Sequence, residues 1–296
     1  MSFNFIRYSK IYFTFSGILI LGSLVSLFVF GLNPGIDFTG GSIMELHYQG
    51  SRPEVSAVRE SLSEFGPVYV QTTGDKGLII RMKDIPEETH QQILQILSDG
   101  YQVEERRFES IGPVIGRELK EKTKLLIAVA LFSVVFYVAL AFRKVQRPIA
   151  SWQYGIVSLV ALFHDVLIPI GVFSVLGKLY GVQITIPVVA ALLTILGYSI
   201  NDTVVVFDRI RENLIKRVGV TFEETVNKSL NQTVARSINT SLTTLLVLLA
   251  IYFFGGATLQ YFALALIIGI LAGTYSSIFL ASPLLVFYLT RFKKYV

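Results

Sequence analysis

The chain alternates between long uncharged segments and short charged ones. Residues 11–36 and 125–142 carry no charge, and the 54 residues from Ser237 to Thr290 contain none either. A membrane-spanning helix needs about 20 apolar residues, so the last run is long enough for two spans separated by the turn residues 255–258. The pattern therefore predicts six transmembrane helices, near residues 11–32, 124–142, 150–176, 184–207, 235–254 and 259–288.

Basic residues in the short loops predict the orientation of these helices. Cytoplasmic loops of membrane proteins are enriched in Lys and Arg, and one orientation puts four basic clusters on that side, leaving only Lys178 in a short loop on the other. We therefore expect both termini in the cytoplasm and the segment between the first two helices outside. The clusters are Arg7 and Lys10, Arg143 to Arg147, Arg209 to Arg236, and Arg291 to Lys294.

The segment 33–120 differs from the rest because it holds most of the acidic residues and alternates between strand and helix patterns. Residues 74–77, between two apolar runs, are typical of a hairpin turn. The expected order is β-α-β-β-α-β, the ferredoxin-like plan. Three domains follow: residues 1–32 with the first helix, an extracytoplasmic ferredoxin-like α+β domain over 33–120, and helices two to six over 121–296.

Composition supports a membrane protein and offers no sign of an enzyme. Of the residues, 52% are hydrophobic and 16% charged, and the mean hydropathy is +0.59, which is unlike a soluble globule. There is no cysteine, so the outer domain must rely on its core alone. We find no nucleotide-binding loop, zinc spacing or nucleophile–base arrangement, and expect no catalysis, cofactor or metal site. The net charge of +5 reflects topology and does not indicate nucleic-acid binding.

Asp202 lies inside an apolar segment that becomes charged only at Asp208. Six residues at a rise of 1.5 Å place it roughly 9 Å inside that border. An ionisable group in hydrocarbon costs several kcal/mol, and its usual uses are a proton or ion relay, a ligand counter-ion or an interhelical pair. The alternative is that Asp202 reaches interfacial water and only marks a helix end.

Arg236 opens the fifth predicted helix at a comparable depth and is the expected partner of Asp202. Polar residues follow on one stripe of each helix, so an acid and a base on facing stripes would form a water-accessible path. The alternative for Arg236 is an arginine that extends to the membrane interface. The stripes are Arg236, Thr240 and Thr243 on the fifth helix, and Thr194, Tyr198 and Asn201 on the fourth.

Asp165 is the other acid within a predicted span, and it sits nearer the middle of its helix than Asp202. A carboxyl group there needs either a proton or hydrogen-bond donors. His164 is adjacent in sequence and not one turn away, so we do not expect it to serve. Asp165 is then either a second protonatable site or a structural hydrogen-bonding group facing a neighbouring helix.

Three motifs in order resemble the SecF family, membrane subunits of the bacterial SecDF protein-export apparatus. They are Gly35-Ile36-Asp37-Phe38-Thr39-Gly40-Gly41 after the first span, residues 111–119 before the second, and residues 197–213, which include Asn201, in the fourth. From the residues alone, the glycines allow tight turns where the chain enters a strand, and Asp37 would cap or hydrogen-bond that turn.

The resemblance implies an architecture and partners. Six helices with a large outer domain after the first resemble half of a transporter of the RND superfamily, whose two pseudo-symmetric halves enclose the functional site. The other half would come from a SecD-like subunit. The expected function is to use the proton-motive force to promote preprotein movement through, or release from, the Sec channel in the bacterial inner membrane, embedded in its lipid. The resemblance also matches Asp202 and Arg236 to residues implicated in proton-coupled movement.

Two other functions remain open from the sequence. Half of a proton-coupled RND-type exporter of small molecules would share the helices and acids, but should have much larger outer domains. A purely structural assembly subunit would explain the domain and the packing, but not Asp202. Transport by the purified chain alone would favour the exporter, and unchanged export after neutralisation of Asp202 would favour the scaffold.

Overall fold

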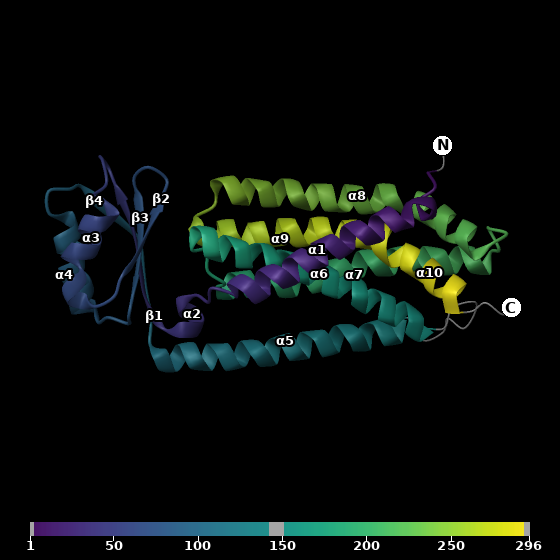
Figure 1. Cartoon of the computed structure of the whole chain (residues 1–296), viewed down its shortest axis with the longest axis horizontal. Helices are drawn as coiled ribbons and strands as arrows, with labels where there is room; N and C mark the ends of the chain where they lie inside the picture. Colours follow the sequence, from purple (N-terminus) through teal and green to yellow (C-terminus); the bar gives the residue numbers. More distant parts are fainter. Residues whose placement is uncertain (1–2, 142–150, 293–296) are drawn as a thin grey trace. The chain divides into compact units, whose positions relative to one another are not determined.

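The computed structural model describes residues 3–141 and 151–292 and divides the chain into two compact units (Figure 1). One unit comprises residues up to Leu32, Ile127–Val182 and the chain from Ile186 onward; the other comprises Asn33–Leu126 with Gln183–Thr185. The observed division at residue 126 lies six positions beyond the expected boundary at 120. The basic residues Arg143, Lys144, Arg147, Lys293 and Lys294, used to infer orientation, lie outside the described residues.

The smaller unit is a four-stranded antiparallel sheet with two helices, in the strand order β2-β3-β1-β4. This order and the β-α-β-β-α-β sequence confirm the ferredoxin-like plan. A 3₁₀ turn, Ser63–Phe65, continues the first helix. The elements are β1 (Gly41–Tyr48), α3 (Val55–Ser61), β2 (Tyr69–Thr73), β3 (Gly77–Met82), α4 (Glu87–Ser98) and β4 (Val103–Ile111).

The core of this unit forms because alternate residues of a strand face the same side of the sheet. Met44, Leu46 and Tyr48 of β1 are buried, and Leu78 and Ile80 of β3 are buried beside them. The two helices add apolar residues at helical spacing, so one hydrophobic cluster holds the unit together without disulfides. The helix residues are Val58, Leu62, Ile93 and Leu97.

The glycine motif forms a compact turn ahead of β1. It contains the one-turn helix α2 (Ile36–Thr39), with Asp37 in its first turn. Gly40 has φ +73° and Gly41 φ +130°, backbone conformations that glycine tolerates best. The turn is also crowded: a Cβ on Gly40 would lie 2.9 Å from Pro113 Cα, and one on Gly41 2.7 Å from the carbonyl oxygen of Met82. Two of the sequence motifs therefore meet at this turn.

The helices long and apolar enough to cross a membrane belong to the larger unit, except that one of them begins in the smaller unit. Within the described residues there are six such spans, confirming the predicted number and class. Several begin earlier than hydropathy indicated, since a helix continues beyond its hydrocarbon-embedded part. The helices are α1 (Ser9–Phe30, after a 3₁₀ turn at Ile6–Tyr8), α5 (Pro113–Ala141), α6 (Ser151–Tyr180), α7 (Ile186–Ile215), α8 (Phe222–Phe254), and α9 (Ala257–Ser276), which continues through the π-helical segment Ser277–Ala281 into α10 (Ser282–Phe292).

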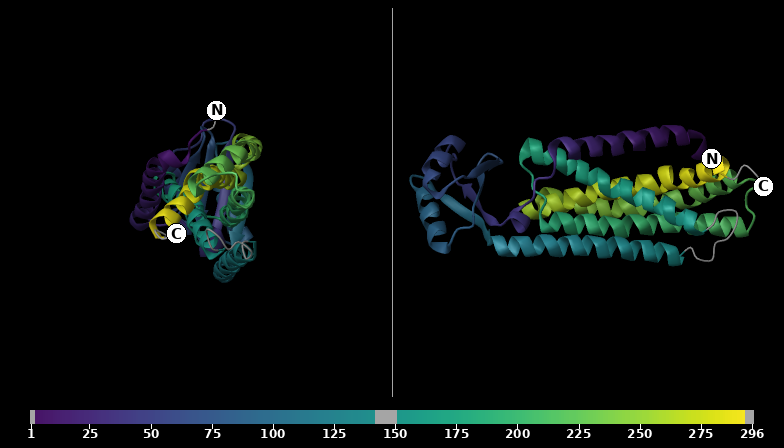
Figure 2. Two further views of the ribbon diagram at one scale, coloured as in Figure 1. Left: turned by 90° about the vertical axis from the view of Figure 1, so that its right-hand side faces the viewer. Right: turned by 60° about the horizontal axis from the view of Figure 1, so that its bottom comes forward.

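Helix α9 is the centre of the bundle because it packs against α6, α7 and α8, while α6 also packs against α1 (Figure 2). A buried apolar cluster joins these helices, including Tyr154 of α6, Phe207 of α7 and Leu230 of α8. The ring of Tyr154 meets that of Phe207 edge-on at 5.3 Å. Polar residues are buried in the same interior, and several of them are serines. The helix packing thus encloses a polar interior, which contains the candidate site.

Candidate functional site

Asp202 on α7 is half-buried and is held by hydroxyl groups from two other segments. Its Oδ1 accepts a hydrogen bond from Ser237 Oγ of α8 at 2.6 Å, and its Oδ2 accepts one from Ser277 Oγ at 2.5 Å. Hydrogen bonds to an ionised acceptor are stronger than bonds between neutral groups. The carboxylate therefore joins α7, α8 and the start of the π-helical segment at one point.

The π-helical segment explains why Ser277 faces Asp202. A π turn inserts an extra residue into the helix and shifts the direction of the side chains around it, and such turns often occur at functional sites. Ser277 Oγ also donates to the carbonyl of Thr274 at 3.1 Å, and Ser282 Oγ donates to the carbonyl of Ser277 at 3.1 Å. Hydropathy along the chain contains no signal for this irregularity.

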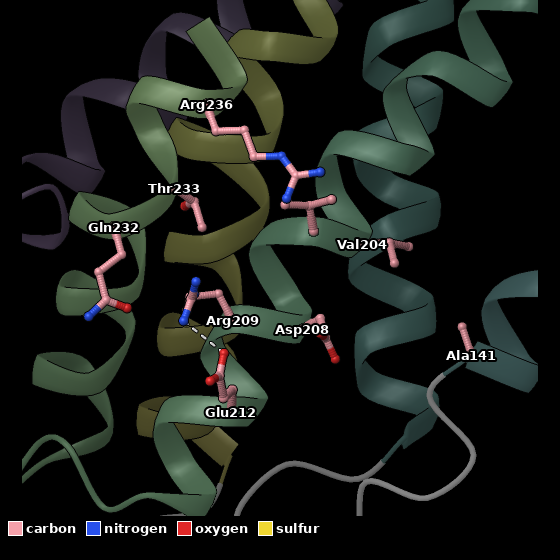
Figure 3. A pocket seen from close by; sticks show the side chains of 9 residues that line it. Ala141, Val204, Asp208, Arg209, Glu212, Gln232, Thr233 and Arg236 are labelled. Atoms are coloured by element: carbon pink, nitrogen blue, oxygen red, sulfur yellow. Dashed lines mark hydrogen bonds and ion pairs between the residues drawn. The ribbon is translucent and has the colours of Figure 1, made fainter. Parts of the chain in front are cut away.

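Arg236 does not pair with Asp202 in this structure. Among the described residues, its side chain forms no ion pair, and Ser237, one position along α8, takes the carboxylate instead. The exposed Arg236 side chain lines a cavity of about 280 Å³ at the charged end of α7, shared with Asp208, Arg209 and Glu212 (Figure 3). The expected ion pair is thus absent here, because the cavity side of α8 presents Arg236 and the interior side presents Ser237.

Asp165 forms a second, completely buried polar cluster. Its Oδ2 accepts hydrogen bonds from Ser199 of α7 and, at 2.7 Å, from Ser276 of α9. Its Oδ1 lies 2.8 Å from Nδ1 of His164. We did not expect His164 to serve Asp165 because it is adjacent in sequence, and this expectation was wrong: the two side chains lie within hydrogen-bond distance, with His164 as donor when its Nδ1 carries the proton. The contacts to α7 and α9 are those expected if Asp165 is a structural hydrogen-bonding group. They do not decide whether Asp165 is also a protonatable site.

The predicted polar stripes lie on outward faces of α7 and α8. Asn201 and Thr194 of α7 are exposed, as are Thr240 and Thr243 of α8. The hydroxyl group of Tyr198 lies 3.4 Å from that of Thr244, which follows the α8 stripe by one residue. In lipid an exposed polar face is unfavourable, so this face is suited to protein or water and not to hydrocarbon.

The serines are the functional residues that sequence reasoning underestimated. None of Ser237, Ser276 and Ser277 was expected as a partner of an acid. Their signal is the adjacent pair of hydroxyls in an otherwise uncharged run, which would be expensive in hydrocarbon without a partner. Which carboxylate each would meet depends on how the helices pack.

The glycine-motif residues of the outer unit take part in backbone turns and hydrogen bonds. Gly40 and Gly41 form the turn described above, and the N–H of Gly35 donates to the carbonyl of Ile184 at 2.8 Å. The carboxylate of Asp37 contributes to the electrostatics around Arg107, whose pKa is raised mainly by its hydrogen bond to Glu109 and to a smaller degree by more distant carboxylates. No group of three His, Cys, Asp or Glu side chains suited to a metal occurs in the described parts of the chain.

His90 forms a titratable cluster in the outer unit. Its ring stacks on Phe108 at 3.7 Å between centroids, and its two nitrogens lie 3.0 Å from Glu87 and 2.7 Å from Glu105. Burial alone would lower the pKa of His90, but the hydrogen bonds and charges of Glu87 and Glu105 outweigh it, so the pKa is raised above its ordinary value. The protonated imidazole therefore stabilises this part of the outer unit.

Comparison with known proteins places this architecture in a family. Residues 92–291 match the family described as protein export membrane protein SecD/SecF, C-terminal, and residues 25–51 match the SecD/SecF GG motif. The chain is 42% identical to the protein translocase subunit SecF of Thermobaculum terrenum, over 96% of this chain and 93% of that protein. It is 39% identical to the corresponding subunit of Vibrio alginolyticus, over 95% and 88%.

A solved structure agrees with the fold. The crystal structure of SecDF from Thermus thermophilus, described as a translocon-associated membrane protein, superposes with a TM-score of 0.86 at 36% identity. The match covers 98% of this chain but 39% of that longer one. Family motifs, curated relatives and structure agree over nearly the whole chain, and the chain therefore belongs to the SecD/SecF family of protein-export membrane proteins, as a multi-pass subunit of the SecF type.

Proposed function

We propose that this chain couples proton movement across the membrane to protein export. The observation that carries the proposal is the environment of Asp202, a carboxylate within a membrane-spanning helix whose two oxygens are held by serine hydroxyls from other segments. An intramembrane ionisable residue that faces the bundle interior is by default a functional site. A neutral residue would suffice for packing alone.

Protonation of Asp202 would change the packing of three segments. As a carboxylate it accepts from both Ser237 and Ser277; as an acid one of its oxygens carries a proton and becomes a donor. In the proposal, the hydroxyl that faces the protonated oxygen meets a donor and turns to another acceptor, so either α8 or the π-helical segment loses its donated hydrogen bond to α7. We propose that ionised Asp202 also has a second arrangement, in which the Arg236 side chain leaves the cavity and pairs with the carboxylate.

The driving force is sufficient for such a rearrangement. Moving one charge through a membrane potential of 100 mV is worth about 2.3 kcal/mol. A two-state equilibrium responds to about 1.4 kcal/mol with a tenfold change in population. One or two protons per cycle would therefore bias the bundle strongly, without covalent catalysis, a cofactor or a nucleotide.

The proposal requires a second half. Relatives include a protein translocase subunit SecDF in which this chain matches 39% of a longer protein, as expected if SecF-type and SecD-type halves work together. The exposed polar faces of α7 and α8 would meet a SecD-like subunit, since small and hydroxyl-bearing residues suit helix contacts in lipid. The pair would lie in the bacterial inner membrane with both termini in the cytoplasm, beside the Sec channel, and the outer unit would act on the emerging preprotein.

Export driven by a proton gradient tests the proposal directly. Inverted membrane vesicles containing Asp202→Asn should start export with ATP as the parent does, but should lose the stimulation by an imposed gradient. Asp202→Glu, which still titrates, should keep part of it. Glu223→Gln, on the exposed first turn of α8, is the matched control. A parent-like response of the Asn variant, at equal amounts of inserted protein, would refute the proposal.

A further inference from the structure

The pair His164–Asp165 in α6 is completely buried among membrane-spanning helices, with both side chains 0% exposed. Two adjacent titratable groups at such a position are expensive unless their charges and hydrogen bonds are satisfied. The hydrogen-bond partners of the four polar atoms show where this pair is satisfied and where it is not.

Both oxygens of the Asp165 carboxylate have hydrogen-bond partners. Nδ1 of His164 lies 2.8 Å from Oδ1, and Ser199 and Ser276 both donate to Oδ2. All three contacts are satisfied when Asp165 is ionised and the proton of the neutral imidazole is on Nδ1. A proton placed on Asp165 would remove the charge that these donors stabilise.

The second ring nitrogen of His164, Nε2, has no hydrogen-bond partner of this kind in the parts of the chain that the structure describes. Nε2 of His164 is buried and has no hydrogen-bond partner among the described residues. In the tautomer that donates from Nδ1, Nε2 carries a lone pair and can accept a proton. That proton would change the net charge of the pair from −1 to zero, which a low-dielectric interior favours. The arrangement therefore supplies an acceptor atom without disturbing the contacts of Asp165.

The backbone near the pair is irregular on both sides. Pro169 lies inside α6, and proline lacks the N–H that would bond to the carbonyl four residues earlier, which is that of Asp165. On the facing segment, Ser276 ends α9 and Ser277 begins the π-helical turn. Irregular helices at membrane depth occur where they are buried in protein or line a polar interior.

Ser276 and Ser277 connect the pair to Asp202. Ser276 donates to Asp165 at 2.7 Å, and the next residue, Ser277, donates to Asp202 at 2.5 Å. Protonation of His164 would weaken the attraction between Asp165 and the Ser276 hydroxyl, because the imidazolium then shares the negative charge of the carboxylate. Ser276 and Ser277 lie on one helical turn, so a change at either site acts on the same element.

We propose that His164 and Asp165 form a second proton-holding site, in which Nε2 of His164 takes the proton while Asp165 remains ionised, and that Ser276 and Ser277 couple this site to Asp202. The N–H bond forms at Nε2 as an O–H bond of a hydronium ion breaks and leaves water, and no other covalent bond changes. This inference rests on the proposed function for its role in export, but the site itself is defined independently of Asp202.

The groups that face this site are few. From α9, the ring of Tyr275 lies 6.0 Å from that of His164, and its hydroxyl donates to the carbonyl of Tyr12 of α1 at 3.0 Å. From α7, Ser199 supplies a hydroxyl, and from α9, Ser276 supplies another. Among the described residues, the charged partner of the imidazole is Asp165 alone.

The protonation state of His164 can be measured on the full chain. The protein contains three histidines, so ¹⁵N-histidine labelling in lipid nanodiscs yields few signals, and the one missing from His164→Asn is assigned to His164. On acidification we expect this signal to change from that of neutral imidazole to that of imidazolium. Infrared difference spectra should show no carboxylic-acid band that Asp165→Asn removes. A neutral His164 throughout, or such a band from Asp165, would overturn the proposal.

Export separates this proposal from the first. His164→Asn should lose the gradient-stimulated part of export, and His47→Gln in the outer unit should keep it. If His164→Asn responds to the gradient like the parent, the second site is not coupled and the inference is overturned, even where Asp202→Asn abolishes the response. If Asp202→Asn itself responds normally, the proposed function of Asp202 is refuted, and the titration of His164 still decides whether the proton-holding site exists.

Discussion

The hydroxyl of Ser237 lies 2.6 Å from the carboxylate of Asp202 and attaches α8 to α7 inside the bundle. Arg236, the preceding residue, points instead into the cavity at the charged end of α7 (Figure 3). One turn of α8 thus presents a neutral donor to the interior and a cation to the outside. Adjacent residues of a helix point about 100° apart, so Arg236 would reach Asp202 only after a change in its own rotamer and in the position of α8, which is why this turn is the centre of the proposed mechanism.

Removal of the serine hydroxyls should weaken the bundle and its response to a gradient. Loss of a hydrogen bond to a charged group costs about 1.5–3 kcal/mol, so Ser237→Ala and Ser277→Ala should each lower the thermal unfolding temperature in detergent. Thr243→Val is the control on α8, because the Thr243 hydroxyl bonds to the backbone carbonyl of Thr240. Serine variants as stable and as gradient-responsive as this control would contradict the assignment.

Replacement of Arg236 should affect coupling more than stability. Because its side chain forms no ion pair among the described residues, Arg236→Ala should insert and accumulate like the parent. It should nevertheless lose gradient-stimulated export, as we expect for Asp202→Asn, since ionised Asp202 would then have no cation with which to pair. Arg236→Lys should retain part of the response. The amount of inserted protein and export are measured on the same vesicles, and a fall in amount alone would indicate a structural role.

The glycine turn should tolerate no side chain. At Gly40 and Gly41 an alanine would combine a positive φ with contacts of 2.9 and 2.7 Å to backbone atoms. Strained backbone conformations cost about 1–3 kcal/mol each, a large part of the stability of a small domain. We therefore expect both alanine variants to increase protease sensitivity of the outer unit. Gly50→Ala is the control, because its Cβ would meet nothing within 4 Å.

The outer unit should lose stability as the pH rises. The pKa of His90 is raised in the folded protein, so its protonated form contributes stability that is fully present below the ordinary value of 6.5. That contribution disappears as the pH rises through the raised value. Hydrogen exchange of amides in α4 and β4 should become faster over this range, beyond the intrinsic effect of pH. His90→Gln should remove the additional pH dependence, and an unchanged dependence would exclude His90 as its source.

The exposed polar face should contact a second membrane protein. Because the chain contains no cysteine, a single Thr240→Cys on this face can be cross-linked in native membranes without background. We expect a product with a protein that carries a related set of six helices. Phe28→Cys on α1, where the side chain is 93% exposed, should react with lipid-phase reagents without giving this product. Cross-links from both positions, or from neither, would argue against a partner on this face.

Much of the architecture could be predicted from the sequence because it depends on local patterns. Uncharged runs of sufficient length require spanning helices, since backbone groups in hydrocarbon must bond internally. Turn residues and alternating apolar positions indicated the strands of the outer unit, and the glycines of the entry turn marked a conformation that other residues resist. Asp202 and Asp165 were identified because a charge in an apolar segment is visible without any tertiary information.

The partners of those acids were decided only by the tertiary structure. Ser237, Ser276 and Ser277 are ordinary small residues in sequence, and helical spacing cannot show which of several neighbouring helices each will face. The expected Asp202–Arg236 pair failed for this reason: the rotation of α8 and a π turn after α9 brought hydroxyls to the carboxylate instead. Charge in an apolar run is a property of one segment, whereas satisfaction of that charge depends on contacts between segments far apart in the chain.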